Sequence, residues 1–299
     1  MEGLAVDGVL FISQGKELID ASFKEITANP HFLIDLPQDK TEAILNEGLK
    51  AHSLQVEWQT ELLSFSQSEN TVSAQVKNSA GEEEQIDCHW LIACDGAHST
   101  VRHAAGISFE GSDYKQNWWL ADLFIDWTMP ANRMVIYLSS KGPLACFPMG
   151  NKRYRLVMTA PKDAHNEPDM QAIEQAFKER CTDDAQLSHP QWITQFFIHH
   201  RQIKEYRQKR VFFAGDAAHI HSPMGGQGLN TGIQDIYNLV WKLALVQKGQ
   251  GTEPLLDSYH KERYPIGKEV LTKTDIMTRM ILIKNTAIIG LRNALLSRL

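Results

Sequence analysis

The 299-residue sequence predicts an α/β fold, in which a doubly wound domain is interrupted by an inserted, mainly antiparallel β-sheet domain. Two predicted strands, Ile86–Cys94 and the apolar run Val211–Ala214, each lead to an aspartate, and open α/β sheets place their ligands at such strand ends. Between them, residues 109–206 carry aromatic side chains in alternating, strand-like runs. The composition, 43% hydrophobic and 22% charged, is that of a soluble globular protein.

The charge and the cysteines exclude several classes of protein. The net charge of 30 − 36 = −6 argues against a general nucleic-acid binder. The four cysteines form no C-x-x-C pair, and no His/Cys cluster has zinc spacing, so we expect no metal site and reduced thiols. The N-terminus does not look like a signal peptide, and no apolar run reaches the ~18 residues of a membrane span. We therefore expect a cytoplasmic protein; the oligomeric state does not follow from the sequence.

The first half of the chain alternates strands and helices. Residues 1–36 are expected to form strand-like pieces with turns, followed by a helix over Thr41–His52 with Thr41 as its N-cap. Leu54–Val76 predicts two strands around a polar turn at Ser66–Asn70. After the strand Ile86–Cys94, Ser99 is expected to cap a short helix that Gly106 ends.

In the second half, one helix over Asp169–Cys181 is expected inside the β domain. After the strand Val211–Ala214, a stripe at helical period predicts an amphipathic helix, and a second helix runs from about Leu255 to Val270. The last segment, 272–299, is apolar with scattered cations. We expect a terminal helix packed on the protein rather than an amphipathic helix at a membrane surface. The stripe that predicts the helix after Val211–Ala214 consists of Leu229, Ile233, Ile236, Val240 and Leu243.

The segment after Val211–Ala214 has the residues of a cofactor site. Asp216 follows the strand, and three glycines at 225, 226 and 228 allow a backbone to approach a flat or anionic group closely. The helix that comes next directs the positive end of its dipole at that group. A strand, an acid, a glycine-rich turn and a helix N-terminus within 21 residues therefore predict that a cofactor binds here.

Two long motifs carry a family resemblance. Residues 95–102, Asp-Gly-Ala-His-Ser-Thr-Val-Arg, match the motif D-G-x-x-S-x-V-R, and residues 215–219 match G-D-A-A-H. With the loop 222–230, the helical segments 238–244 and 259–263 and, less specifically, Pro37-Gln38, residues 30–270 resemble the group A flavin-dependent aromatic hydroxylases, typified by p-hydroxybenzoate hydroxylase and phenol hydroxylase. The resemblance implies a GR2-like FAD-binding fold with an inserted substrate domain.

The resemblance also implies roles for single residues. Asp216 would accept hydrogen bonds from the ribityl hydroxyls of FAD, and Pro223 would lie beside the isoalloxazine. The backbone 225–230 would face the flavin N1–C2=O edge. Asp95 would hold the pyrophosphate–ribose region, Arg102 the phosphates of the nicotinamide cofactor, and Gln38 would be a further flavin contact. The implied cofactor-binding set is Gln38, Asp95, Gly96, Arg102, Gly215, Asp216, Pro223, Gly225, Gly226, Gly228, Leu229 and Asn230.

The implied function is that of an FAD-dependent monooxygenase, an oxidoreductase that uses NAD(P)H and O2 to hydroxylate a small, phenol-like aromatic substrate. No catalytic residue is assigned. One alternative is a related flavoprotein that acts on a quinone or polyprenyl substrate at a membrane surface, for which the basic, apolar segment 272–299 is the supporting feature. The other is a non-catalytic remnant with impaired FAD binding.

One departure from the family supports the second alternative. The family opens with a strand, a G-x-G-x-x-G turn and a helix that receives the FAD pyrophosphate. Here Gly226-Gln-Gly228 and Gly249-Gln-Gly251 are the nearest matches, and neither follows the first strand of a βαβ unit. We therefore expect an N-terminally truncated FAD-binding domain. The predicted division is 1–108 for the partial FAD-binding domain, 109–206 for the substrate domain, 207–271 for the return to the first domain, and 272–299 for the terminal helix.

Several other conspicuous residues are expected to be structural. His219 and His221 are predicted to be structural or next to the flavin, since no further residues with metal-ligand spacing accompany them in the sequence. His98 and His103 are predicted at the surface, and Cys94 as a small buried hydrophobe. Trp118, Trp119 and Trp127 are expected in the core of the middle sheet rather than at the substrate.

Overall fold

The computed structural model describes residues 3–27, 32–161, 164, 167–283, 288–290 and 292–293, which form two compact units. The unit that we call the β-sheet unit comprises Met1–Gln55, Lys115–Phe197 and Arg279–Leu299. The motif unit comprises Val56–Tyr114 and Ile198–Thr278, and it holds both sequence motifs. Residues 1–55 thus group with the large sheet. The functional division into FAD-binding and substrate domains stays a prediction.

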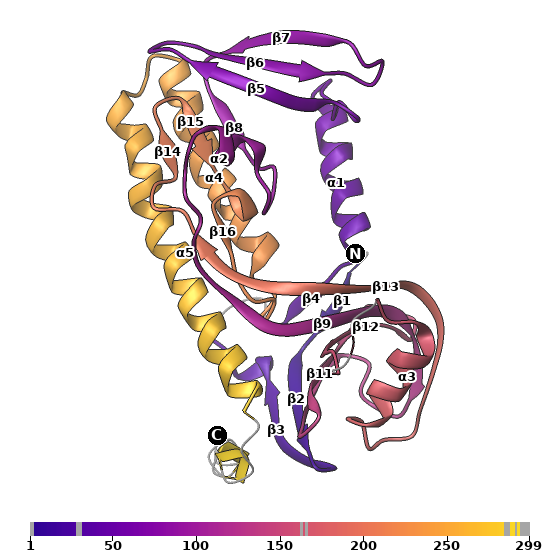
Figure 1. Cartoon of the computed structure of the whole chain (residues 1–299). Helices are drawn as coiled ribbons and strands as arrows, with labels where there is room; N and C mark the ends of the chain where they lie inside the picture. Colours follow the sequence, from indigo (N-terminus) through magenta and orange to yellow (C-terminus); the bar gives the residue numbers. More distant parts are fainter. Residues whose placement is uncertain are drawn as a thin grey trace. The chain divides into compact units, whose positions relative to one another are not determined.

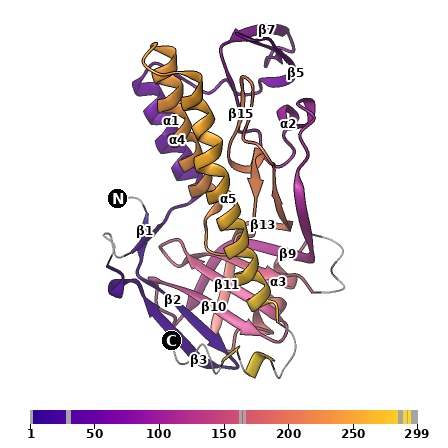
Figure 2. The same ribbon diagram turned by 90° about the vertical axis from the view of Figure 1, so that its left-hand side faces the viewer.

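A large mixed sheet, most of which lies in the β-sheet unit, has the strand order β16-β13-β9-β12-β11-β10-β2-β3, with β16 (His219–Ile220) at its edge (Figure 1). Strand β10 pairs with β2 in parallel, whereas β2–β3, β10–β11, β11–β12 and β12–β9 are antiparallel. Figure 2 shows β2, β10 and β11 next to one another. The strands are β2 (Gly8–Ser13), β3 (Lys16–Ser22), β9 (Glu110–Trp127), β10 (Arg133–Ser139), β11 (Gly142–Pro148), β12 (Arg153–Thr159) and β13 (Ala185–Gln202). The predicted mainly antiparallel arrangement of the aromatic region is confirmed.

The core of this unit lies between the sheet and helix α3 (Met170–Lys178). The Asp169 side chain accepts a hydrogen bond from the Ala172 amide at 2.8 Å, so this helix begins where the sequence predicts it. Phe177 packs on Trp127, and the amphipathic helix buries its apolar side against the strands. Trp118 and Trp119 are buried, which confirms their predicted place in the core.

The same unit contains a small antiparallel pair, β1 (Leu4–Val6) and β4 (Leu33–Asp35), a 3-10 turn η1 (Phe23–Glu25) and helix α1 (Gln38–Ala51). The predicted N-cap Thr41 is wrong, because α1 begins directly after Pro37 and Thr41 lies inside the first turn. Proline favours such a start, since its φ is fixed. No residue of α1 is buried within the part of the chain that the structure describes.

The motif unit contains two small sheets. Strands β5 (Glu61–Gln67), β6 (Val72–Lys77) and β7 (Glu83–Cys88) form an antiparallel meander, at the top of Figure 1. The predicted pair of strands around the turn at 66–70 is therefore confirmed. The other sheet has the order β14-β15-β8 and consists of β14 (Arg207–Gln208), β15 (Val211–Phe213) and β8 (Leu91–Ala93). The expected single strand Ile86–Cys94 is divided, because a bend at His89 separates β7 from β8.

Two long helices complete the motif unit, namely α4 (Gly228–Gln247) and α5 (Glu253–Ile281), of which the last three residues belong to the β-sheet unit. The unit also contains the short helix α2 (Thr100–Ala104), the 3-10 turn η2 (Gly215–Ala217) and strand β16 (His219–Ile220). The predicted helix is confirmed, but most of its apolar stripe does not pack inward: Leu229 is 55% exposed and Ile233 46% exposed, whereas Leu243 is buried. The buried residues of α4 are Thr231, Asp235, Leu239, Lys242 and Leu243.

Helix α5 continues past the predicted end near Val270, so residues 272–281 belong to it rather than to a separate terminal helix. Much of the remaining segment, namely 284–287, 291 and 294–299, lies outside the described residues. Over the ranges that are described, none of the helices combines the length and the apolar character needed to cross a bilayer.

Candidate functional site

The two sequence motifs follow neighbouring parallel strands. Strand β15 pairs with β8 in parallel, with Phe213 opposite Ala93, and the Ala214 amide donates to the Ala93 carbonyl at 3.0 Å. The carboxyl ends of parallel strands meet at the same edge of a sheet, so Asp95 and Asp216 both follow that edge. The structure thereby brings together two motifs that are 120 residues apart in the sequence.

The first motif forms a self-contained turn and helix. The Asp95 carboxylate accepts a hydrogen bond from the Val101 amide at 3.1 Å, and the Ser99 hydroxyl accepts one from the Arg102 amide at 2.9 Å. These bonds satisfy amides of the first turn of α2, which have no partner inside the helix. Gly96 and Gly106 have positive φ angles of 82° and 68° at the two ends of the segment. The predicted cap at Ser99 and stop at Gly106 are confirmed.

The Arg102 side chain joins this motif to the second one. Its guanidinium donates to the carbonyl oxygens of Ala97 at 2.7 Å and Ala217 at 3.2 Å, and it lies 4.2 Å from the centre of the Phe109 ring. The side chain is buried. These contacts give Arg102 a structural role between the two strand ends. Its contact with the phosphates of a nicotinamide cofactor stays a prediction.

The second motif presents its carboxylate to solvent. Gly215 takes a positive φ of 56° and opens the turn η2, which places Asp216 directly after the buried strand β15. The Asp216 side chain is exposed, and no described residue donates a hydrogen bond to it. An ionised carboxylate accepts hydrogen bonds and donates none, so this group is suited to a ligand that carries several hydroxyl donors.

The glycine-rich loop after it leads into an uncapped helix. Gly225 and Gly226 have φ angles of 88° and 62°, in the left-handed region that favours glycine. Helix α4 begins at Gly228, and no side chain caps its N-terminus. The Asn230 side chain donates to the Gly226 carbonyl at 3.2 Å and so ties the loop to the first turn. The backbone amides of that turn are therefore available to an acceptor on a ligand.

A buried acid that the sequence interpretation missed supports this loop. Asp235 on α4 is 0% exposed, and it accepts hydrogen bonds from the Gly215 amide at 3.2 Å and the His219 Nε2 at 2.7 Å. Its other oxygen accepts from the Arg263 Nε at 2.7 Å. A signal was present: Asp235 lies in an apolar helix, and Arg263 ends the helical segment 259–263 that resembles the family. His219 is structural, as one of the two predictions for it stated.

His221 is held in one tautomer. Its Nδ1 lies 2.8 Å from the Ser222 carbonyl oxygen, which can only accept, so Nδ1 carries the proton. Burial lowers the pKa of His221 below its usual 6.5, and the Ser222 carbonyl opposes that shift. The imidazole ring stacks on that of His219, with the ring centres 6.5 Å apart. The neutral ring packs behind the loop that leads to α4.

The remaining predicted residues have mixed outcomes. His98 and His103 are exposed, as predicted. Cys94 is also exposed, so its prediction as a buried hydrophobe is wrong; β8 already ends at Ala93. Gln38 belongs to the β-sheet unit, where it is the first residue of α1 and donates to Glu42 at 3.2 Å. Its contact with flavin stays a prediction.

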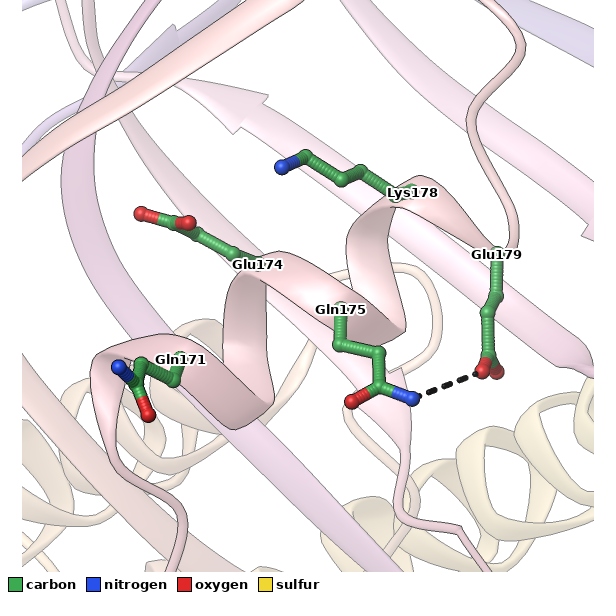
Figure 3. Close-up of a pocket in the computed structure, with 5 residues that line it drawn as sticks. All are labelled: Gln171, Glu174, Gln175, Lys178 and Glu179. Atoms are coloured by element: carbon green, nitrogen blue, oxygen red, sulfur yellow. Dashed lines mark hydrogen bonds between the residues drawn. The ribbon is translucent and has the colours of Figure 1, made fainter.

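Two hollows lie within the β-sheet unit. The larger has a volume of about 800 Å³, and both polar and apolar side chains line it, among them Asn117, Thr159, Arg180 and Leu282. The other is a shallow surface on α3 (Figure 3), where the Gln175 amide donates to Glu179 at 3.4 Å. All five residues drawn there are polar or charged, which does not suit an aromatic ring.

A parallel strand pair, an exposed acid at its carboxyl edge and a glycine-rich turn into an uncapped helix define an α/β cofactor-binding domain. A family model described as FAD binding domain matches residues 8–274. The chain therefore belongs to this family, whose members include flavin-dependent aromatic monooxygenases.

Three relatives illustrate the similarity. An uncharacterized aromatic compound monooxygenase of Bacillus subtilis is 35% identical over 94% of this chain and 59% of its own length. Pentachlorophenol 4-monooxygenase of Sphingobium chlorophenolicum is 35% identical over 84% of this chain and 48% of its own. The structure of an anhydrotetracycline hydroxylase from Streptomyces rimosus has a TM-score of 0.77 and 30% identity, over 98% of this chain and 59% of that one. The chain thus spans about half the length of these relatives.

The groups at the site fit one part of FAD. The exposed Asp216 carboxylate can accept hydrogen bonds from ribityl hydroxyls, and the uncapped amides at the start of α4 can donate to a flavin carbonyl or ring nitrogen. A Cβ at Gly226 would meet no atom within 4 Å, so there is open space above this turn. The donors and acceptors on the protein are therefore complementary to those of the flavin and the ribityl chain.

Proposed function

We propose that this chain holds the flavin and ribityl part of FAD in an NAD(P)H-dependent monooxygenase that hydroxylates a small, phenol-like aromatic substrate. The observation that carries the proposal is the exposed Asp216 carboxylate, which accepts no hydrogen bond from a described residue and precedes the uncapped N-terminus of α4. When it is bound, the flavin supplies the redox chemistry with O2 and the nicotinamide.

The residues of the chain would bind and orient the cofactor. Asp216 would accept the ribityl hydroxyls, and Pro223 would lie beside the ring. The amides of residues 228–230 would stabilise negative charge at the N1–C2=O edge, where the helix dipole adds to their effect. Asp95 and Gly96 would approach the pyrophosphate–ribose region, although the Asp95 carboxylate already accepts a bond from its own helix.

The name of one relative, pentachlorophenol 4-monooxygenase, supports a phenol-like substrate, and that of another, anhydrotetracycline hydroxylase, supports an aromatic one. The cavity of about 800 Å³ in the β-sheet unit is large enough for a compound of one to three rings. Its polar wall would orient ring hydroxyls, and Leu282 and its neighbours would contact the apolar face.

Purification of the chain with added FAD tests the proposal. We expect yellow protein with a resolved flavin spectrum, and NAD(P)H oxidation that rises when phenols are added. The Asp216→Ala variant, purified in parallel, should retain much less flavin. Colourless wild-type protein would contradict FAD binding and would favour the non-catalytic alternative, for which the lack of a G-x-G-x-x-G turn in residues 1–299 is the supporting feature.

A further inference from the structure

Asp235 connects four elements of the motif unit from a fully buried position. It lies on α4, and its carboxylate accepts from the Gly215 amide of η2, from His219 of β16 and from Arg263 of α5. Oδ2 receives the first two bonds, and Oδ1 receives the bond from Arg263. The acid therefore links the turn before Asp216 to both long helices.

The backbone of the turn is packed closely against α4. Gly232 of α4 lies against Gly215, so that a Cβ added to Gly232 would come within 3.2 Å of the Gly215 Cα. Gly215 itself has a φ of 56°, which side chains disfavour. The turn thus rests directly on α4, and Asp235 holds its first amide one helical turn further along.

The negative charge of Asp235 is compensated by a neighbouring arginine. A single buried carboxylate would be costly, and the Arg263 guanidinium pairs with it at 2.7 Å. Arg263 also donates to the Thr231 carbonyl at 3.4 Å, so it is held by α4 at two positions. The pair can therefore fix the position of the Gly215 amide without transferring a proton or contacting a ligand.

We propose that Asp235, held by Arg263, is a positioning residue for the flavin site: it fixes the Gly215–Asp216 turn so that the Asp216 carboxylate is presented outward. The link to flavin binding rests on the proposed function, whereas the positioning of the turn can be measured without flavin. Asp235 itself would not contact the flavin; it acts on the Gly215–Asp216 turn through the hydrogen bond from the Gly215 amide.

The chain offers a matched control in the same helix pair. Lys242 of α4 is also 0% exposed at its side chain, and its Nζ donates to Glu262 of α5 at 2.7 Å and to Asn238 at 2.9 Å. Lys242→Met breaks a buried polar link between α4 and α5, as Asp235→Asn does. It has no bond to the turn before Asp216, so it reports the effect of loosening the helices alone.

The test is amide hydrogen exchange at Gly215 in the wild type and the two variants. Asp235→Asn turns one acceptor oxygen into an NH2 donor that faces Arg263 or the Gly215 and His219 donors, so we expect Gly215 to exchange at least about tenfold faster. Lys242→Met should leave exchange at Gly215 within about twofold of the wild type, after correction for global stability. Equal effects of the two variants would overturn the proposal.

A double variant and a flavin titration complete the experiment. In the double variant Asp235→Asn with Arg263→Gln, the two new side-chain amides can pair with each other, so slow exchange at Gly215 should return. If neither the single nor the double variant folds, Asp235 serves global stability, and the proposal is overturned. The dissociation constant for FAD should rise about tenfold in Asp235→Asn and stay unchanged in Lys242→Met. If even the wild type binds no FAD, the proposed function fails, while exchange at Gly215 still decides the positioning role.

Discussion

The two strand-end motifs of the motif unit have the same arrangement, but their aspartates differ in their hydrogen bonds. Each follows one of two paired parallel strands, and each places an aspartate after the strand. Asp95 and Asp216 are both exposed, but the Asp95 carboxylate accepts a hydrogen bond from the Val101 amide of its own segment. The Asp216 carboxylate accepts no hydrogen bond from a described residue, and a second acid, Asp235, supports its turn. The two motifs therefore differ in whether the acid holds its own segment or another residue holds the turn.

Arg102→Met gives the largest expected effect, because it breaks the link between the two motifs. The substitution leaves the carbonyls of Ala97 and Ala217 without their donor and should lower the free energy of unfolding by about 3 kcal/mol. Urea denaturation measures this, with exposed His103→Gln as the neutral control. If Arg102→Met weakened only the use of NAD(P)H and left stability intact, the phosphate contact implied by the resemblance would be the better account.

Asp216→Ala separates the second motif from the first. The loss of a charged acceptor for ribityl hydroxyls should weaken FAD binding by about 2 kcal/mol, roughly 30-fold. The melting temperature of the flavin-free protein should not change, since no described residue bonds to this carboxylate. A fluorescence titration with FAD measures the affinity, and an unchanged dissociation constant would show that the ribityl assignment is wrong.

Ser99→Ala tests the first motif by itself. The hydroxyl accepts from the Arg102 amide at 2.9 Å, and such N-caps contribute about 1 kcal/mol to stability. Thr100→Ala, at the exposed first residue of α2, is the matched control and should change stability little. Both variants should bind FAD like the wild type under conditions in which they are folded. A large loss of affinity in Ser99→Ala would show that the first motif also affects flavin binding.

The smallest effect concerns pH and the second motif. Burial keeps the folded-state pKa of His221 below 6.5, so the unfolded chain binds more protons just below that pH, and stability should fall as the pH drops through that range. His221→Gln should flatten this part of the profile, whereas exposed His98→Gln of the first motif should not. Melting temperatures between about pH 5 and pH 8 compare them. Identical slopes in His221→Gln and the wild type would contradict the assignment.

Local signals in the sequence predicted the elements whose causes are local. Ser99 and Asp169 cap the helices that they precede, and Gly106 ends α2 in a left-handed conformation. The buried strand Val211–Phe213 follows from its apolar run. In each case a few neighbouring residues supply the hydrogen bonds or the burial, and the same few residues are visible in the sequence.

The face that α4 buries could not be predicted in this way. The apolar stripe and the inward face of α4 both recur at helical period, and the pattern favours the stripe because it has more apolar residues. The inward face is the one that carries Asp235 and Lys242, because α5 and the turn at Gly215 supply their partners. A periodic pattern cannot reveal partners that lie 20 to 28 residues away in the chain.

By itself, the sequence determined the class of site: two strand-end acids, a glycine-rich turn and a helix start, each written in contiguous residues that also carry the family resemblance. Only the tertiary structure decided which acid bonds within its own segment and which residues hold the turn before Asp216. The physical reason is that a carboxylate takes its role from its neighbours in space. The Asp95 carboxylate accepts a hydrogen bond from an amide of its own segment, and that of Asp235 accepts from donors on three other elements. The exposed Asp216 carboxylate accepts no hydrogen bond from a described residue.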